Sequence, residues 1–366
     1  MKNPMVLVRC FTATVLFLIL AKANVWSDTQ THLTLAVGYR ALLLAAPAFM
    51  LFGMSLGIIA SLGLGVLALI AMFFSMNPVT VGLFALSMAV SGFICKTVNS
   101  QTMQGTADNK VSLNVGSLFS GLLLMLVSSQ SILLGVCLVL AVISLVLALK
   151  INWNREYSFE IKKSAHTQKS SRSIGAVVGW CLVGVATGIK LTGVFTILPQ
   201  YLLQNTKSLP FWYGALISVN SLGVIFFQHR ILNYLNKKGF RWIFNAAISS
   251  LILLSLPAVF RVQYLPSALV WIFLLTVGEC AFSAFDKLAN DKGYLFPKEV
   301  MVGAGSFLTV FLSRELGEYV FLSGALGLFC LILGVGLTHW KPIAVSFAGA
   351  RPKVKLLRSS DSTSSR

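Results

Sequence analysis

The distribution of basic residues between long hydrophobic segments is the feature that most constrains this 366-residue chain. About 20 apolar residues are enough for a helix to cross the roughly 30 Å hydrocarbon layer of a bilayer. The segments that twelve crossings place on one side hold 23 of the 29 Lys and Arg residues, and segments on the other side hold five. Because one missed crossing would exchange the sides of every later loop, this bias supports the count of twelve. The twelve predicted spans lie near 5–22, 38–56, 58–76, 79–95, 111–128, 131–149, 174–203, 211–229, 242–260, 265–285, 300–315 and 319–338.

The same bias predicts the orientation of the chain. Translocation of basic residues in short loops is disfavoured, so both termini are expected in the cytoplasm. Short loops and the lack of an N-x-Ser/Thr site favour a bacterial inner membrane over other membranes. The sequence therefore predicts an all-α, multi-pass protein of the cell inner membrane.

The net charge of +18 lies in short loops and in the tail at 341–366. A protein that binds nucleic acid gathers its charge on one face of a folded domain, so no nucleic-acid partner is expected. Anionic membrane lipids are the expected partners of this charge. We expect the protein to be a monomer.

Catalytic and metal-binding motifs are lacking in the sequence. The six cysteines form no C-x-x-C motif, and no cysteine or histidine pair has the spacing of zinc ligands. No loop with Gly-Lys-Ser/Thr and no recognisable nucleophile set is present. We therefore predict no metal, no cofactor and no enzymatic activity.

A polar stretch in the middle divides the chain into two halves of six predicted spans each. Two six-helix bundles joined by a basic linker are typical of transporters built from parallel repeats. In each half the fourth span is followed by a polar segment of similar length, predicted as loops at 96–110 and 286–299. The predicted divisions are an N-terminal bundle at 1–150, a cytoplasmic linker at 151–173, a C-terminal bundle at 174–340 and a cytoplasmic tail at 341–366.

Two hydrophobic regions need a closer reading. The first span, with Lys2, Arg9 and an Ala-Lys-Ala sequence at 21–23, also resembles a secretory signal with a cleavage site, although six spans per half favour its retention. The uncharged block 41–76 would be about 54 Å long as a single helix, too long for one crossing, so it must fold back. The small residues Gly53, Gly57, Ser61, Gly63 and Gly65 offer break points.

Two stretches of the second half resemble the major facilitator superfamily of transporters. The segment 230–241 carries Lys237, Gly239 and Arg241 at the positions of that family's basic, glycine-containing cytoplasmic loop, with Asn236 where an acid is usual. The segment 276–303, with Thr-Val-Gly-Glu at its start, is similar to the tenth span of drug-efflux members. The first half lacks the corresponding basic loop between its second and third spans, so the chain resembles an atypical member.

The resemblance implies two pseudo-symmetric six-helix bundles around a cavity that is lined by the first, fourth, seventh and tenth spans. Lys190 and Glu279 are ionisable residues inside the seventh and tenth spans, where a charge is costly and commonly functional. The resemblance then directs both into the cavity, facing each other, as residues for substrate binding or proton coupling. Snorkelling of Lys190 to an interface and a structural role for Glu279 are the simpler alternatives.

Further charged residues are candidates for gating. The resemblance implies such a role for Lys237, Gly239 and Arg241. Arg314, Glu315 and Glu318 cluster where the eleventh and twelfth spans meet, and Arg314 and Glu318 have the spacing of an ion pair on one helix face. An outer gate and an ordinary ion pair that closes a short turn both fit this cluster.

We predict a secondary active transporter that moves a small organic solute by alternating access, with proton coupling. A non-transporting polytopic membrane component is one alternative, since the first half lacks the family loop. A membrane-embedded enzyme of lipid or glycan metabolism is another, but the acids and histidines expected of it at a membrane face are sparse.

Overall fold

The computed structural model describes residues 4–26, 39–127, 129–151, 173–206, 213–256, 264–315 and 322–339, and these form helices without any strand. The elements are α1 (Pro4–Trp26), η1 (Tyr39–Ala45), α3 (Ala46–Met50), α4 (Met54–Phe74), α5 (Pro78–Asn99), α6 (Met103–Leu126), α7 (Gln130–Lys150), α10 (Ile174–Thr206), α11 (Tyr213–Lys238), α12 (Phe240–Ser255), α13 (Leu265–Asp291), α14 (Leu295–Glu315) and α15 (Leu322–His339).

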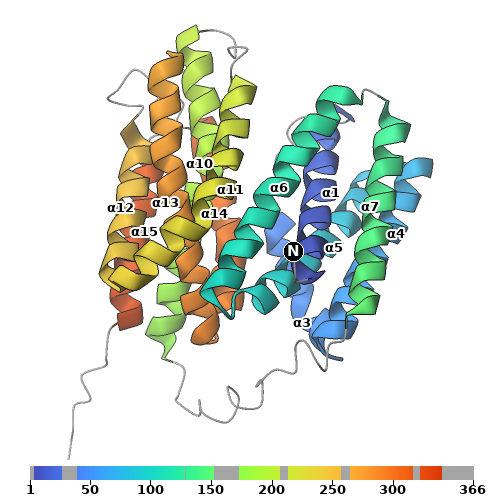
Figure 1. Cartoon of the computed structure of the whole chain (residues 1–366), viewed down its shortest axis with the longest axis horizontal. Helices are drawn as coiled ribbons and strands as arrows, with labels where there is room; N and C mark the ends of the chain where they lie inside the picture. The colour runs from blue at the N-terminus through green and yellow to red at the C-terminus, as the bar shows by residue number, and fades with distance from the viewer. Residues whose placement is uncertain are drawn as a thin grey trace, which may run out of the picture.

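The helices form two bundles that follow the order of the chain, with α1 to α7 in one and α10 to α15 in the other (Figure 1). The packing scheme of the first bundle recurs in the second. The first helix, α1, packs against α5, α6 and α7, and α10 packs in the same way against α13, α14 and α15. Likewise α4 packs against α5 and α7, as α12 does against α13 and α15. The bundles are therefore two copies of one helical arrangement, as expected of parallel repeats.

The contacts between the bundles follow the same repeat. The short helix η1 packs against α14, and α6 packs against α11. If η1 and α3 are counted as one element, the contact of η1 with α14 joins the second element to the eleventh. The contact of α6 with α11 joins the fifth element to the eighth. Exchange of each element with its counterpart six places along the chain converts the first pair into the second, as a pseudo-two-fold axis between the halves requires. The numbered domain boundaries remain a prediction, because residues 152–172 lie outside the described part.

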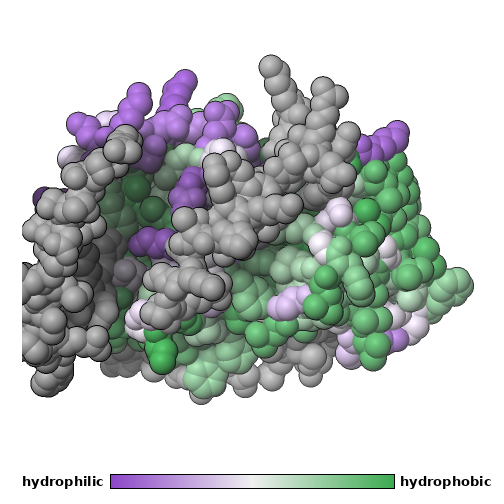
Figure 2. Space-filling view, turned by 90° about the horizontal axis from the view of Figure 1, so that it is seen from below, coloured by the Kyte–Doolittle hydropathy of each residue, from purple (hydrophilic) through white to green (hydrophobic). Residues whose placement is uncertain are grey.

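Membrane insertion is supported by length and by the placement of polar groups. Five helices are long and apolar enough to cross a bilayer within the described residues, namely 54–74, 78–99, 131–150, 174–193 and 265–291. Large apolar side chains such as Phe74, Phe226 and Val270 are more than half exposed, whereas the ionisable side chains of Lys190 and Lys298 are fully buried. Hydrophobic residues cover much of the visible surface on the right of Figure 2, the side of α4 and α7 in Figure 1. The prediction of an all-α membrane protein is confirmed, and the count of twelve crossings stays a prediction.

The second predicted span, 38–56, is not one α-helix, which corrects the sequence-based expectation. It consists of η1 and the five-residue α3, and the chain then turns at Gly53 before α4 begins. Pro47 stands in the first turn of α3, and Gly53 has a φ of +99°, a conformation that glycine adopts without strain. The break within the block 41–76 therefore falls at a predicted position, but the element before it is short and irregular.

The predicted polar loops at 96–110 and 286–299 are largely helical, which is a second correction. A short turn, ending at the N-cap Thr102, separates α5 from α6, and the side chain of Thr102 accepts a hydrogen bond from Gly105 N at 2.9 Å. Only Lys292, Gly293 and Tyr294 separate α13 from α14, and Gly293 has a φ of +74°. Because the helices continue past the apolar segments, they carry charged residues into the packed region between the bundles.

Gly239 lies between α11 and α12 with a φ of +91° and a ψ of 178°, a backbone region that is almost exclusive to glycine. We expect Gly239→Val to destabilise the protein by about 1–3 kcal/mol through backbone strain. An added side chain would meet no atom within 4 Å at Gly239 or at the helical Gly135 of α7, so Gly135→Val is a matched control. Thermal unfolding of the purified variants checks this; equal stability of the two variants would show that the turn tolerates a side chain.

The predicted topology is tested with a reporter that is active only in the cytoplasm. Fusions after Lys163, Lys238 or Lys355 are expected to be active, because these positions follow an even number of predicted spans. Fusions after Asp28 or Lys207 are expected to be silent. Reporter activity after Lys207 would contradict the assignment of the spans.

Candidate functional site

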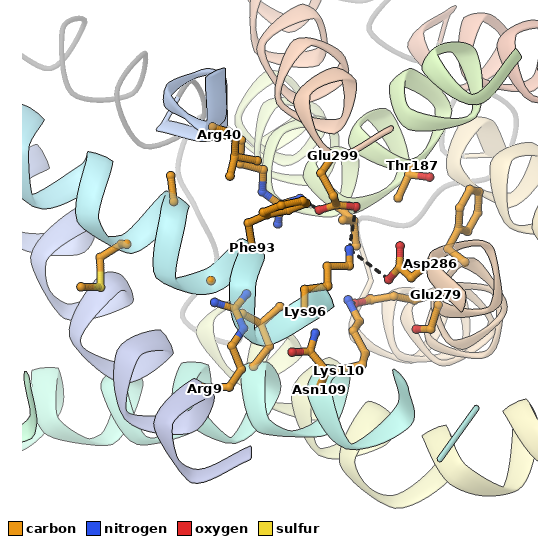
Figure 3. A pocket seen from close by; sticks show the side chains of 18 residues that line it. Arg9, Arg40, Phe93, Lys96, Asn109, Lys110, Thr187, Glu279, Asp286 and Glu299 are labelled. Atoms are coloured by element: carbon orange, nitrogen blue, oxygen red, sulfur yellow. Dashed lines mark hydrogen bonds and ion pairs between the residues drawn. The ribbon is translucent and has the colours of Figure 1, made fainter. Parts of the chain in front are cut away.

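A cavity of about 50 Å³ lies where the two bundles meet. Its lining comes from α1, η1, α5 and α6 of the first bundle and from α10, α13 and α14 of the second (Figure 3). With η1 and α3 counted as one element, α1, α5, α10 and α13 are the first, fourth, seventh and tenth, which the family resemblance implies for a central cavity. A water molecule needs about 10–15 Å³ of such space, so the cavity holds only a few waters.

The charges of the lining are sorted by bundle. All four basic residues come from the first bundle, and all three acidic residues come from the second. The basic set is Arg9, Arg40, Lys96 and Lys110, and the acidic set is Glu279, Asp286 and Glu299. Opposite charges attract strongly in a poorly solvated interior, so this arrangement draws the bundles together.

Lys96 of α5 connects the first bundle to both acids at one end of the cavity. Its Nζ lies 3.0 Å from Asp286 Oδ2 of α13 and 2.7 Å from Glu299 Oε1 of α14 (Figure 3). The guanidinium of Arg40 approaches the other oxygen of Glu299 at 4.0 Å. Nearby, Asn290 Nδ2 donates a hydrogen bond to the backbone oxygen of Thr97 at 3.3 Å. These contacts join the two bundles beside the cavity.

Lys298 holds the two acids together from within the second bundle. Its Nζ is 2.5 Å from Asp286 Oδ1 and 3.1 Å from Glu299 Oε1, and its side chain is fully buried. Without this cation, Asp286 and Glu299 would repel each other in a site of low dielectric constant. The three residues with Lys96 form the ion-pair cluster of the interface.

Glu279 makes a second, separate bridge between the bundles. Its Oε1 lies 2.5 Å from Lys110 Nζ of α6, and its other oxygen accepts a hydrogen bond of 3.4 Å from Asn220 Nδ2 of α11. The hydroxyl of Thr276 in turn donates to Asn220 Oδ1 at 2.8 Å, which fixes the orientation of that amide. Glu279 is only 8% exposed. Its carboxylate is therefore held in place by both bundles.

Lys190 lies in the same bundle as Glu279, on α10. Its neighbours Thr187 and Leu191 line the cavity, whereas Lys190 itself is not among the lining residues. Its side chain is fully buried, and its Nζ has no hydrogen-bond partner among the described residues. The partner of Glu279 in this structure is Lys110, not the Lys190 that the sequence suggested. A functional role of Lys190 stays a proposal.

The predicted gating residues lie elsewhere. Lys237 and Arg241 are exposed on either side of the Gly239 turn, and none of the three lines the cavity. Helix α14 ends at Arg314 and Glu315, and Glu318 falls outside the described residues. Their roles in gating remain predictions.

The sequence analysis missed most of the interface charges, because it assigned Lys96, Lys110, Asp286 and the 298–299 pair to polar loops. One signal for them was available. The cavity residues of α13 recur at positions i, i+3, i+4 and i+7 from Glu279, so Asp286 lies on the same helix face two turns later.

The Lys110–Glu279 bridge makes a prediction about stability. Removal of one partner of a buried ion pair costs about 3–5 kcal/mol in soluble proteins, because the other charge is left unpaired. We expect Lys110→Gln and Glu279→Gln each to lower thermal stability, and the double variant to lose less than the sum. The exposed Lys287–Asp291 pair of α13 is the matched control, with coupling below about 1 kcal/mol. Additive losses at the buried pair in detergent-purified protein would contradict the bridge.

Comparison with known proteins agrees on the fold and leaves the substrate open. No protein-family model matches the sequence, and no curated protein sequence matches it. Solved structures do resemble it, among them the human organic anion transporter MFSD10 (TETRAN), with a TM-score of 0.69 at 11% identity over 90% of this chain and 98% of that one.

Two further structures are similar at comparable identity. The major facilitator superfamily transporter FucP, in an outward conformation, gives a TM-score of 0.58 at 12% identity over 92% of this chain and 98% of that one. A POT family transporter in complex with a thioalcohol-conjugated peptide gives 0.60 at 13% identity over 91% and 94%. Two repeated bundles around a charged cavity, matched along nearly their whole length, give this chain the fold of the major facilitator superfamily transporters.

Proposed function

We propose that this protein is a secondary active transporter that moves a small organic solute across the membrane by alternating access. The observation that carries the proposal is the cavity between two equivalent bundles, whose walls hold opposite charges. The transporters of similar fold differ in chemistry, since one is an organic anion transporter and another was solved in complex with a thioalcohol-conjugated peptide. The fold therefore supports transport, and the solute must be inferred from the cavity.

The geometry fits a closed state in which ion pairs hold the bundles together. The cavity of about 50 Å³ is too small for most organic solutes, so entry requires the bundles to separate at one end. Separation breaks Lys96 from Asp286 and Glu299 at one level, and Lys110 from Glu279 at another. Water that enters the opening then solvates the released charges, which offsets part of the lost attraction.

Proton coupling is assigned to Glu279. Protonation removes the negative charge that holds Lys110, so it weakens one bridge between the bundles. Lys190 lies fully buried in the same bundle as Glu279, and it supplies a positive charge near the carboxylate when Lys110 moves away. On this proposal Glu279 accepts the proton, and Lys190 stabilises the ionised form within its own bundle.

The inner membrane, cytoplasmic termini, contacts with anionic lipids and a monomeric state complete the proposal. The cytoplasmic termini and the lipid contacts rest on the distribution of charge along the sequence, and the inner membrane rests on the short loops and the lack of an N-x-Ser/Thr site. A non-transporting membrane component is the remaining alternative, and an uptake measurement decides between the two.

We expect Glu279→Gln to abolish proton-driven uptake and to leave solute exchange, because glutamine cannot carry the proton but keeps the shape of the side chain. The solute is first found by a metabolite screen on a deletion strain. Uptake and exchange are then measured in proteoliposomes with and without a pH gradient. The control is Asp291→Asn, which removes an exposed acid from the same helix. Wild-type uptake that ignores the gradient would refute coupling, and no uptake or exchange at all would refute transport.

A further inference from the structure

Arg9 is the one basic residue of the cavity lining for which the described structure shows no acidic partner. It lies on α1 and is only 7% exposed, and its Nε has no hydrogen-bond partner among the described residues. Every other basic residue of the lining is within 4.0 Å of a carboxylate. A buried guanidinium without an anion is costly in a membrane protein, and such residues commonly mark a substrate pathway.

The acids of the cavity are already engaged by other cations. Glu279 is paired with Lys110, and both Asp286 and Glu299 are paired with Lys96 and Lys298. In Figure 3 Arg9 lies on the far side of Lys96 from Asp286 and Glu299. Its charge is therefore not neutralised by a nearby acid of the second bundle.

The region as a whole has an excess of positive charge. Six basic side chains meet three acidic ones when the buried Lys190 and Lys298 are included with the lining. A neutral solute would leave this excess uncompensated, and a cation would increase it. An anion lowers the electrostatic free energy of the closed state, and the effect is large where water is scarce.

From these observations we propose that the transported solute is an organic anion and that the Arg9 guanidinium binds its carboxylate or phosphate group. This inference rests on the proposed transport function and names its substrate class. The planar fork of an arginine offers two parallel N–H donors to such a group, which gives both affinity and orientation. Oxyanion binding would also offset the cost of burying an arginine in the first span.

The backbone beside Arg9 leaves room for its guanidinium. A Cβ placed on Gly92 of α5 would lie 2.5 Å from Arg9 Nη1, closer than atoms can approach. Gly92→Ala therefore moves the guanidinium without changing the charge of the cavity. This variant tests whether the position of the guanidinium matters, because the arginine itself is still present.

Arg9→Gln distinguishes binding from a structural role. Since the described structure gives Arg9 no acidic partner, its replacement leaves no carboxylate unpaired, and the ligand-free variant should be as stable as the wild type or more so. A residue that only holds the fold together would lower the melting temperature when replaced. The matched control is Arg230→Gln, which removes an exposed arginine from α11.

The probe is a small-molecule extract of the cells that produce the protein, used intact and after removal of anions on an exchange resin. The intact extract should raise the melting temperature of the purified full chain, and the depleted extract should not. Mass spectrometry of the retained compound identifies it as a carboxylate or a phosphate. Its affinity should fall at least tenfold in Arg9→Gln, less in Arg9→Lys and Gly92→Ala, and not at all in Arg230→Gln.

Stabilisation by the anion-depleted extract, the lack of any stabilising anion, or unchanged anion affinity in Arg9→Gln overturns the inference. Proteoliposome counterflow with the retained compound tests the transport function separately. If the compound that the protein transports is neutral, the anion site at Arg9 is refuted and the transport function stands. If an anion binds through Arg9 but shows no counterflow, the transport function is refuted and the anion-binding site stands.

Discussion

Attraction between a basic wall and an acidic wall, across an interface that water barely enters, is the interaction on which the rest of this structure depends. The outer surface is apolar and suits the lipid, so the hydrophobic effect gives the two bundles little reason to associate. Lys96 and Lys110 of one bundle meet Asp286, Glu299 and Glu279 of the other instead. These contacts are strong while the interface excludes water and weaken once water solvates the charges.

The two bundles share one packing scheme but not one pattern of charge. Helices in equivalent positions, such as α5 and α13, carry Lys96 in the first bundle and Asp286 in the second at the interface. A repeat that conserved the charge as well would place like charges opposite each other, and the bundles would repel. The divergence of the halves at these positions is therefore a condition for their association.

The sequence predicted the larger features of the fold because lipid imposes simple rules. Apolar length located the helices, and charge bias suggested their orientation. Gly239 was predicted as a turn and Gly53 was one of five candidate break points, and φ is positive at both. The interface was missed for a physical reason. Hydropathy places the end of a helix at the first charges, whereas Asp286 and Glu299 continue helical segments into a site where cations neutralise them. Lys298 was read as a loop cation, although its fully buried amine can be stable only beside the acids that the fold supplies.

The three-residue connection between α13 and α14 has a mechanical consequence. It joins the helix of Asp286 to the helix of Glu299 through the turn at Gly293, and Lys298 ties the two carboxylates to each other. The two acids are therefore linked twice, through the short turn and through Lys298, and both contact Lys96. Because the acids share these two cations, the contact of Lys96 with one carboxylate is coupled to its contact with the other.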